Sequence, residues 1–172
     1  MKFFSGFSLK NEEYLFQEYI KESEYTICGF SYGAIKALGT TLEMLENSKR
    51  VDIVQLFSPA FFQNRPEKFK RLQLMGYKKD KDAYIQQFIE KCFAPYEKKR
   101  VENIETDISE LKELLEYEWS LELLKELDSK GVKIEVYLGG KDAIVDSVAA
   151  KEFFVKVATV TYIKDANHFL QL

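Results

Sequence analysis

Apolar residues occur along the chain with two spacings, which predict strands that alternate with helices. Short apolar runs predict five strands, at residues 2–5, 25–28, 51–57, 132–138 and 160–163. Apolar residues three and four positions apart predict helices at residues 11–22, behind an asparagine cap, at 32–46 and at 147–157. Because the strands are mostly apolar runs, the pattern favours an α/β fold with a parallel sheet that is buried on both faces.

Residues 61–117 interrupt this alternation, because they lose strand character. They contain three helix-like segments, near residues 65–76, 79–93 and 104–118, rich in charged and long side chains. No Pro/Gly/Ser-rich linker bounds this block, so we expect an insertion on the sheet and not a separate domain. The sequence therefore predicts a core formed by residues 1–60 and 118–172, with a helical cap at 61–117 inserted after the third strand.

The stretch GFSYG, residues 29–33, matches the GxSxG motif of a nucleophile elbow at the junction of a strand and a helix. In this motif, small residues such as Gly29 and Gly33 permit the tight turn that exposes the serine hydroxyl. The glycines could instead serve only the turn, with Ser31 capping the first turn of the helix. The motif alone leaves both interpretations open.

A serine nucleophile needs a base, and the base needs a carboxylate that orients it. His168 is the only histidine, and it follows the last strand in a polar loop. Asp142 follows the fourth strand, where the functional groups of parallel sheets gather, although it could also be an ordinary turn residue. Asp146 is the expected N-cap of the next helix. The chain order Ser31, Asp142, His168 is the order of α/β-hydrolases.

These motifs resemble the α/β-hydrolase superfamily over nearly the whole chain. FFSGFS at 3–8 resembles the HG-x-G oxyanion loop of this superfamily. Ser5 and Ser8 stand where the family usually has a histidine and a glycine. The resemblance implies that the N–H groups of Phe7 and Tyr32 form the oxyanion hole. LFSPAFF and LGGKDAIV resemble the strand end before the cap and the acid-bearing loop. Only 24 residues separate Phe7 from Ser31, so we expect a minimal α/β-hydrolase fold of about five parallel strands, without the usual N-terminal hairpin and one further strand.

The most specific resemblance is to the pimeloyl-[acyl-carrier protein] methyl ester esterases of biotin synthesis. It is carried by FFSGFSLKNE, CGFSYGAIKAL, FSPAFF and LGGKDAIVD together. It implies a serine carboxylesterase in which Ser31, Asp142 and His168 release methanol from a pimeloyl methyl ester on an acyl-carrier protein. The alternatives are an acyl thioesterase or other small-acyl ester hydrolase, and a non-catalytic acyl- or carrier-binding module.

Charge divides the predicted cap, together with the residues just after it, into a basic half and an acidic half. Residues 62–100 carry 11 basic and five acidic residues, a net charge of +6, whereas residues 101–128 carry ten acidic and two basic residues, a net charge of −8. A basic surface beside an acyl-binding cleft would attract an acidic carrier protein, although such runs are also typical of solvated helix faces. The carrier-binding candidates are Arg65, Lys68, Lys70, Arg71, Lys78 and Lys79. The pocket-wall candidates are Phe7, Tyr32, Phe61, Phe62 and Trp119.

Composition argues against several other classes of protein. The net charge of −3 and the lack of interleaved basic and aromatic residues argue against nucleic-acid binding, and no apolar run is long enough for a membrane span. The first residues become charged too early for a signal peptide, and Cys28 and Cys92 form no CxxC pair, so we expect a cytoplasmic protein. One histidine and two distant cysteines predict no metal site, and without a P-loop or GxGxxG we expect no cofactor.

Overall fold

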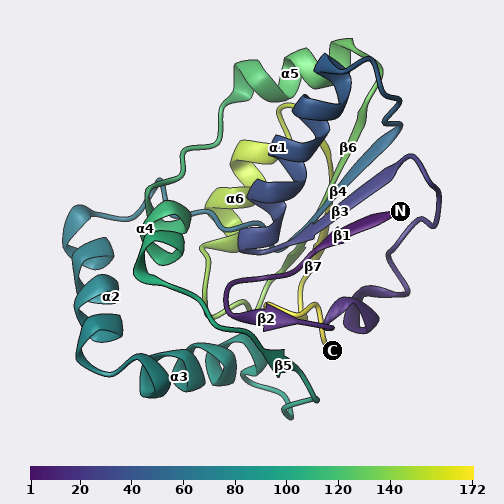
Figure 1. Cartoon of the computed structure of the whole chain (residues 1–172). Coiled ribbons are helices and arrows are strands. Elements are labelled where there is room, and N and C mark those ends of the chain that lie inside the picture. The colour runs from purple at the N-terminus through teal and green to yellow at the C-terminus, as the bar shows by residue number, and fades with distance from the viewer.

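A computed structural model describes all 172 residues and shows one parallel sheet of five strands (Figure 1). The sheet has the order β1-β3-β4-β6-β7. Its strands are β1 (Lys2–Phe4), β3 (Thr26–Phe30), β4 (Ile53–Phe57), β6 (Lys133–Gly139) and β7 (Thr159–Ile163). The predicted α/β fold and the predicted minimal parallel sheet are therefore confirmed.

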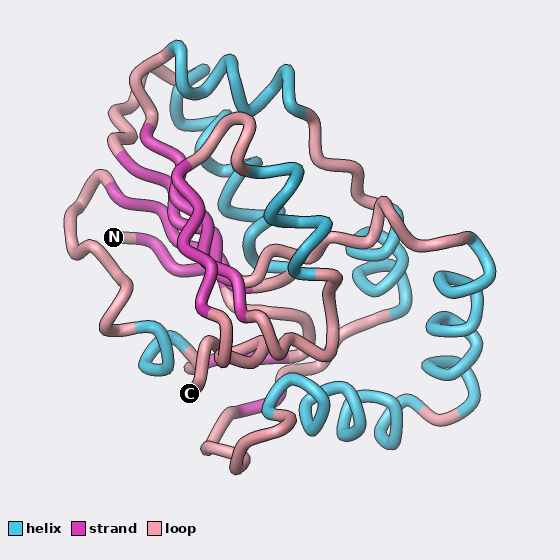
Figure 2. The backbone as a smooth tube through the Cα atoms, turned by 180° about the vertical axis from the view of Figure 1, so that it is seen from behind, coloured by secondary structure: helices cyan, strands magenta, loops and turns pink.

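Three helices cover one face of this sheet, as Figures 1 and 2 both show. They are α1 (Tyr32–Glu46), α5 (Leu121–Ser129) and α6 (Ser147–Phe154). Helix α5 was not expected from the sequence, although Ser120 caps it by accepting from the N–H of Leu123, and Leu124 and Leu127 are buried at helical spacing. None of the helices in the chain combines the length and the apolar character that crossing a membrane requires.

Residues 11–25 cover the opposite face of the sheet, and the prediction of a helix over 11–22 is wrong. Only one short 3-10 helix, η1 (Glu13–Phe16), forms there. The ring of Phe16 packs on Phe30 and Phe57, with centroids 4.9 Å from each. Asn11, the expected cap, has φ of 63° and does not cap a helix. Contacts with the sheet therefore override the helical spacing of this segment.

A buried polar network, and not a helix, joins residues 19–21 to β4 and β6 on this face of the sheet. The side-chain amide of Gln55 on β4 donates to the carbonyl of Tyr19 and accepts from the N–H of Lys21, both at 2.9 Å. The same amide donates to the carboxylate of Glu135 on β6, which also pairs with the ammonium groups of Lys21 and Lys133. Because Gln55 satisfies backbone groups of an irregular segment, that segment can lie across a sheet without helical hydrogen bonds.

The cap segment, which we define as residues 61–117, lies beyond the carboxyl ends of the strands (Figure 1). It contains α2 (Glu67–Lys79), α3 (Lys81–Phe93), β5 (Glu102–Asn103) and α4 (Ile108–Glu116). Strand β5 pairs antiparallel with β2 (Leu9–Lys10), which belongs to the core. The cap segment is therefore joined to the core through a small second sheet as well as through its two ends.

The network around Glu135 predicts a pH dependence of stability. Burial alone would raise the pKa of Glu135, but hydrogen bonds from Lys133, Lys21 and Tyr137 outweigh it and lower the pKa from 4.5 to about 2. The unfolded chain binds this proton at a higher pH than the folded chain does, so the stabilisation is complete above about pH 4.5 and is lost as the pH falls toward 2. Glu135→Gln should lack this component of the acid-induced loss.

Urea unfolding of both proteins between pH 7 and pH 2 measures this difference. Glu43→Gln is the control, because the exposed carboxylate of Glu43 on α1 pairs with no other group. Parallel stability curves for the wild type and Glu135→Gln over the acid range would contradict the prediction.

Candidate active site

The backbone of Ser31 is strained at the junction of β3 and α1. Its φ is 53° and its ψ is −113°, a conformation that residues with a Cβ rarely adopt. The N–H of Ser31 donates to the carbonyl of Phe57 at 2.9 Å, so the β3–β4 ladder continues into the turn. Gly29 and Gly33 leave room for this turn. A Cβ on Gly29 would lie 2.3 Å from the carbonyl oxygen of Gly33, and a Cβ on Gly33 would lie 2.0 Å from the carbonyl oxygen of Phe4. The two glycines are needed for close packing, since neither has a positive φ.

The side chain of Ser31 bonds to histidine and not to the helix that follows it. Ser31 occupies the N-cap position of α1, but its side chain accepts no hydrogen bond from the first turn. Its Oγ instead lies 3.1 Å from Nε2 of His168. The interpretation of Ser31 as a simple helix cap therefore finds no support in the geometry.

Asp142 completes a chain of three hydrogen-bonded side chains. Its Oδ2 lies 2.6 Å from Nδ1 of His168, and both side chains are 0% exposed. Its Oδ1 accepts from the N–H groups of Ile144 and Val145, at 2.7 and 3.0 Å. Because an ionised carboxylate only accepts, the bond places the ring proton on Nδ1 and leaves Nε2 free to accept from Ser31. Asp142 therefore organises its own turn and also orients the histidine.

Two neighbouring loops approach closely enough to bring Asp142 and His168 together. A Cβ on Gly139 would lie 2.2 Å from the carbonyl oxygen of Asn167, and one on Gly140 would lie 2.2 Å from that of Lys164. Gly140 donates to the carbonyl of Ile163, and the side chain of Asn167 donates to the carbonyl of Phe93 at 2.7 Å. The glycine pair in LGGKDAIV is a sequence signal for a close backbone approach, but the sequence does not say which loop approaches, and Asn167 was not singled out.

Asp146 caps the helix after Asp142, and Phe30 packs against His168. Asp146 caps α6 by accepting from the N–H of Ala149 at 3.0 Å, which confirms the expected N-cap. The ring of Phe30 lies 5.0 Å from the ring of His168 and 4.8 Å from that of Phe169. The imidazole is therefore held between a carboxylate and an aromatic wall.

The two expected oxyanion donors have no competing acceptor. Tyr32 is the first residue of α1, so its N–H precedes the hydrogen-bond ladder of the helix. The N–H of Phe7 donates to no group of the protein. Ser8, which stands where the resemblance expects glycine, has φ of 59° and bonds through its hydroxyl to that of Thr106 at 2.6 Å. A hydrogen bond to the cap segment thus holds Ser8 in a conformation that glycine would adopt without strain.

A side-chain contact joins the cap segment to the elbow. The hydroxyl of Tyr32 donates to Oε2 of Glu113 on α4 at 2.5 Å, and Lys36 lies over the ring of Tyr32 while pairing with Glu110. Burial, and then the carboxylate of Glu113, raise the pKa of the Tyr32 hydroxyl well above its ordinary value. The residue after Ser31 therefore binds α4 as well as the core.

A cavity of about 140 Å³ lies between the cap segment and the core. Ala143 and Ile144, which follow Asp142, and Phe7, in the expected oxyanion loop, bring its wall close to the three bonded side chains. Ser31 itself is only 4% exposed and does not line it. The remaining lining residues are Phe62, Arg65, Phe69, Gln73, Tyr84, Gln87, Phe88, Lys91, Leu111, Leu114 and Leu115.

Among the predicted pocket walls, Phe7 and Phe62 line this cavity, and Tyr32, Phe61 and Trp119 do not. The ring of Phe61 packs on α6, 5.4 Å from that of Phe153. The indole N–H of Trp119 donates to the carbonyl of Ala60 at 2.8 Å. The backbone N–H of Trp119 also donates to Oε1 of Gln63 at 2.7 Å. Phe61 and Trp119 therefore join the start of the cap segment to the core and do not form the cavity wall.

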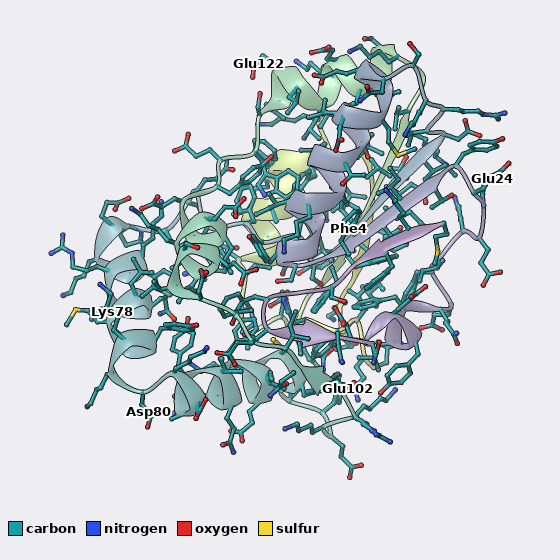
Figure 3. The ribbon with its side chains drawn as sticks, in the orientation of Figure 1. Phe4, Glu24, Lys78, Asp80, Glu102 and Glu122 are labelled. Carbon is teal, nitrogen blue, oxygen red and sulfur yellow. The ribbon has the colours of Figure 1, made fainter.

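The expected carrier-binding residues fall into three groups. Arg65 lines the cavity, where its Nε is buried without a partner. Lys70 is mostly buried and pairs with Glu67 at 3.4 Å. The others lie exposed on α2 without a paired acid, namely Lys68, Arg71, Lys78 and Lys79. Figure 3 shows Lys78 on the outer side of α2, away from the sheet.

No set of three histidine, cysteine, aspartate or glutamate side chains is grouped closely enough to hold a metal ion. The two cysteines are buried and free.

No family model and no curated protein matches the sequence. Solved structures do match. An esterase (EaEST) from Exiguobacterium antarcticum has a TM-score of 0.63 and 16% identity, over 83% of this chain and 59% of its own. BioG from Haemophilus influenzae has a TM-score of 0.57 and 9% identity, over 97% of this chain and 87% of its own. Naproxen esterase (carboxylesterase NP) from Bacillus subtilis has a TM-score of 0.53 and 19% identity, over 95% of this chain and 61% of its own.

The chain thus spans about three fifths of the length of the two esterases and most of the length of BioG. At such low identities the likeness is one of architecture. The chain has the α/β-hydrolase fold.

Proposed function

We propose that the protein is a serine carboxylesterase. The observation that carries this proposal is the hydrogen-bonded chain from Ser31 through His168 to Asp142 at the carboxyl edge of the sheet. The likeness in fold to two esterases supports it. Two N–H groups without internal acceptors, those of Phe7 and Tyr32, lie in the segments where such enzymes bind the oxyanion.

In the proposed reaction, His168 acts as a base and then as an acid. Its Nε2 accepts the proton of Ser31 as Oγ attacks the ester carbonyl, and the N–H groups of Phe7 and Tyr32 stabilise the negative oxygen. Asp142 stabilises the imidazolium that forms. The alcohol leaves with the proton from His168. His168 then takes a proton from the water that attacks the acyl-enzyme, and it returns this proton to Oγ of Ser31 as the acid is released.

The proposed substrate is a pimeloyl methyl ester carried by an acyl-carrier protein, as the sequence resemblance implies. A dry apolar cavity of about 150 Å³ holds a six-carbon ring such as benzene. The cavity beside the site, about 140 Å³ and lined mainly by aromatic and aliphatic side chains, therefore suits an acyl chain of similar size. Arg65, Gln73 and Gln87 add polar groups to its wall, which suit the polar end of such a chain.

The outer face of α2 supports a negatively charged carrier as partner. Exposed basic and apolar residues recur there at helical spacing: Lys68, Arg71, Leu72, Met75, Lys78 and Lys79. Leu72 and Met75 are 54% and 58% exposed. The basic half of the cap segment pairs with the acidic half only between Lys81 and Glu105, so these charges on α2 remain free for a partner.

Removing the proposed nucleophile or base should abolish turnover of a short free ester. Ser31→Ala and His168→Ala should each lower kcat by at least about 10³-fold, because neither residue works without the other. Asp142→Ala should also lower kcat, since the imidazole loses its orientation. Spectrophotometric assays of p-nitrophenyl esters measure these effects.

Ser58→Ala is the matched control. Ser58 is another fully buried serine at the carboxyl end of a strand, and its hydroxyl has no hydrogen-bond partner. Its replacement should leave kcat within about threefold of the wild type, as expected of a site outside the triad. Equal activity of Ser31→Ala and the wild type would rule out the proposed chemistry.

Charge reversal on α2 should affect only the carrier-bound ester. Lys68→Glu combined with Arg71→Glu should lower kcat/KM for the carrier-bound monomethyl ester by about tenfold or more at low salt, and less at high salt. The free monomethyl ester should be hydrolysed at an unchanged rate. Lys49→Glu combined with Lys156→Glu is the control, because it makes the same change in net charge at exposed positions outside the cap segment.

Mass spectrometry of the carrier identifies the bond that is cleaved. The proposal expects a carrier that keeps its acyl chain and is lighter by one CH₂ group. A carrier released as the free thiol would establish a thioesterase instead. An equal decrease in kcat/KM for the carrier-bound and the free ester in the α2 variant would contradict the carrier-docking role.

A further inference from the structure

A buried carboxyl group lies directly against the expected oxyanion loop. Glu12 is 0% exposed, and its Oε1 accepts a hydrogen bond from the N–H of Gly6 at 2.7 Å. Its Oε2 has no hydrogen-bond partner. Burying a carboxyl group that is only half satisfied costs stability, and an apolar side chain would fill the same space without that cost. The position of Glu12 therefore calls for a role other than packing.

The hydrogen bonds of Gly6 fix the direction of the N–H of Phe7. The carbonyl of Gly6 accepts from the N–H of Leu9 at 3.1 Å, which closes a four-residue turn. This carbonyl and the N–H of Phe7 belong to one planar trans peptide, so they point in opposite directions. With the N–H of Gly6 held by Glu12 and its carbonyl held by Leu9, the N–H of Phe7 must point away from the turn.

The third residue of this turn is anchored from the opposite side. Ser8 has φ of 59°, which suits the third position of a type II turn but strains a residue with a Cβ. Its hydroxyl bonds to that of Thr106, and its carbonyl accepts from the N–H of Ile104 at 3.1 Å. The backbone of Gly6 packs closely against the core, because a Cβ there would lie 2.8 Å from the ring of Phe30. The loop is thus held by Glu12 from inside and by the cap segment from outside.

We propose that Glu12 is a positioning residue that aims the N–H of Phe7 at the oxyanion by holding the N–H of Gly6. This inference rests on the proposed esterase function. Glu12 touches neither the ester nor Ser31 and acts only through the peptide of Gly6 and Phe7. Burial raises the pKa of Glu12, against the lowering effect of the Gly6 N–H. A neutral carboxyl or a carboxamide at this place would provide the same Oε1 acceptor without a charge close to the oxyanion.

The test compares Glu12→Gln, which keeps the acceptor, with Glu12→Met, which keeps only the volume. Glu12→Gln should retain kcat within about threefold. Glu12→Met should lower kcat by about 10²-fold at nearly constant KM, which is the loss expected when one oxyanion donor is misplaced. Its affinity for an alkylboronic acid, which forms a tetrahedral adduct on a reactive serine, should fall by a similar factor. Glu13→Met, at the partly exposed neighbouring position, is the control.

A second variant tests the loop if Glu12→Met does not fold. Thr106→Val keeps the shape of the side chain but removes the hydroxyl that holds Ser8, so it should also lower kcat with KM unchanged, by about tenfold as for one net hydrogen bond. Wild-type kcat and boronic acid affinity in folded Glu12→Met would overturn the role of Glu12 and leave the esterase proposal standing. If Glu12→Met does not fold, a kcat lowered by about 10²-fold in folded Glu12→Gln would overturn the positioning role, because the carboxamide keeps the acceptor for the N–H of Gly6. A wild-type protein that hydrolyses no ester would overturn both.

Discussion

The structure depends on one constraint, the close approach of backbone segments at the carboxyl edge of the sheet. Any side chain at Gly33 would overlap the carbonyl of Phe4, and any side chain at Gly139 would overlap that of Asn167. Without these approaches the strained turn at Ser31 could not form, and the loop of His168 could not reach Asp142. Close packing thus fixes the positions of three hydrogen-bonded side chains that come from three separate loops.

The same edge is coupled to the cap segment by hydrogen bonds on two sides. The hydroxyl of Tyr32 binds Glu113 on α4, and Ser8 binds Thr106 just before α4. Tyr32 is itself an expected oxyanion donor and Ser8 follows the other one, so the positions of both expected donors depend on the position of α4. Ser31 and His168 are 4% and 0% exposed, and electrostatic interactions are stronger in such a buried place than in water.

Much of the core and the three side chains that meet at the carboxyl edge of the sheet could be predicted from the sequence, because both depend on local signals. Apolar runs predicted all five strands of the parallel sheet, and the GxSxG turn and the single histidine pointed to Ser31 and His168, which the structure brings within hydrogen-bond distance. The features that were predicted wrongly or not at all depend on tertiary contacts. Residues 11–22 have helical spacing, but the bonds of Gln55 hold residues 19–21 in an irregular path. A sequence also does not show that Gly139 and Gly140 face a loop more than 20 residues away, or that Glu12 turns inward.

The central claim is that the geometry around Ser31 makes this one hydroxyl a nucleophile. Mass spectrometry after treatment with an alkyl fluorophosphonate tests it most directly, because the reagent phosphonylates only activated serines and needs no knowledge of the substrate. The account predicts one adduct per chain, located on Ser31 after peptide mapping, and no adduct in His168→Ala. An unmodified chain, or an adduct on another residue in the folded wild-type protein, would contradict it.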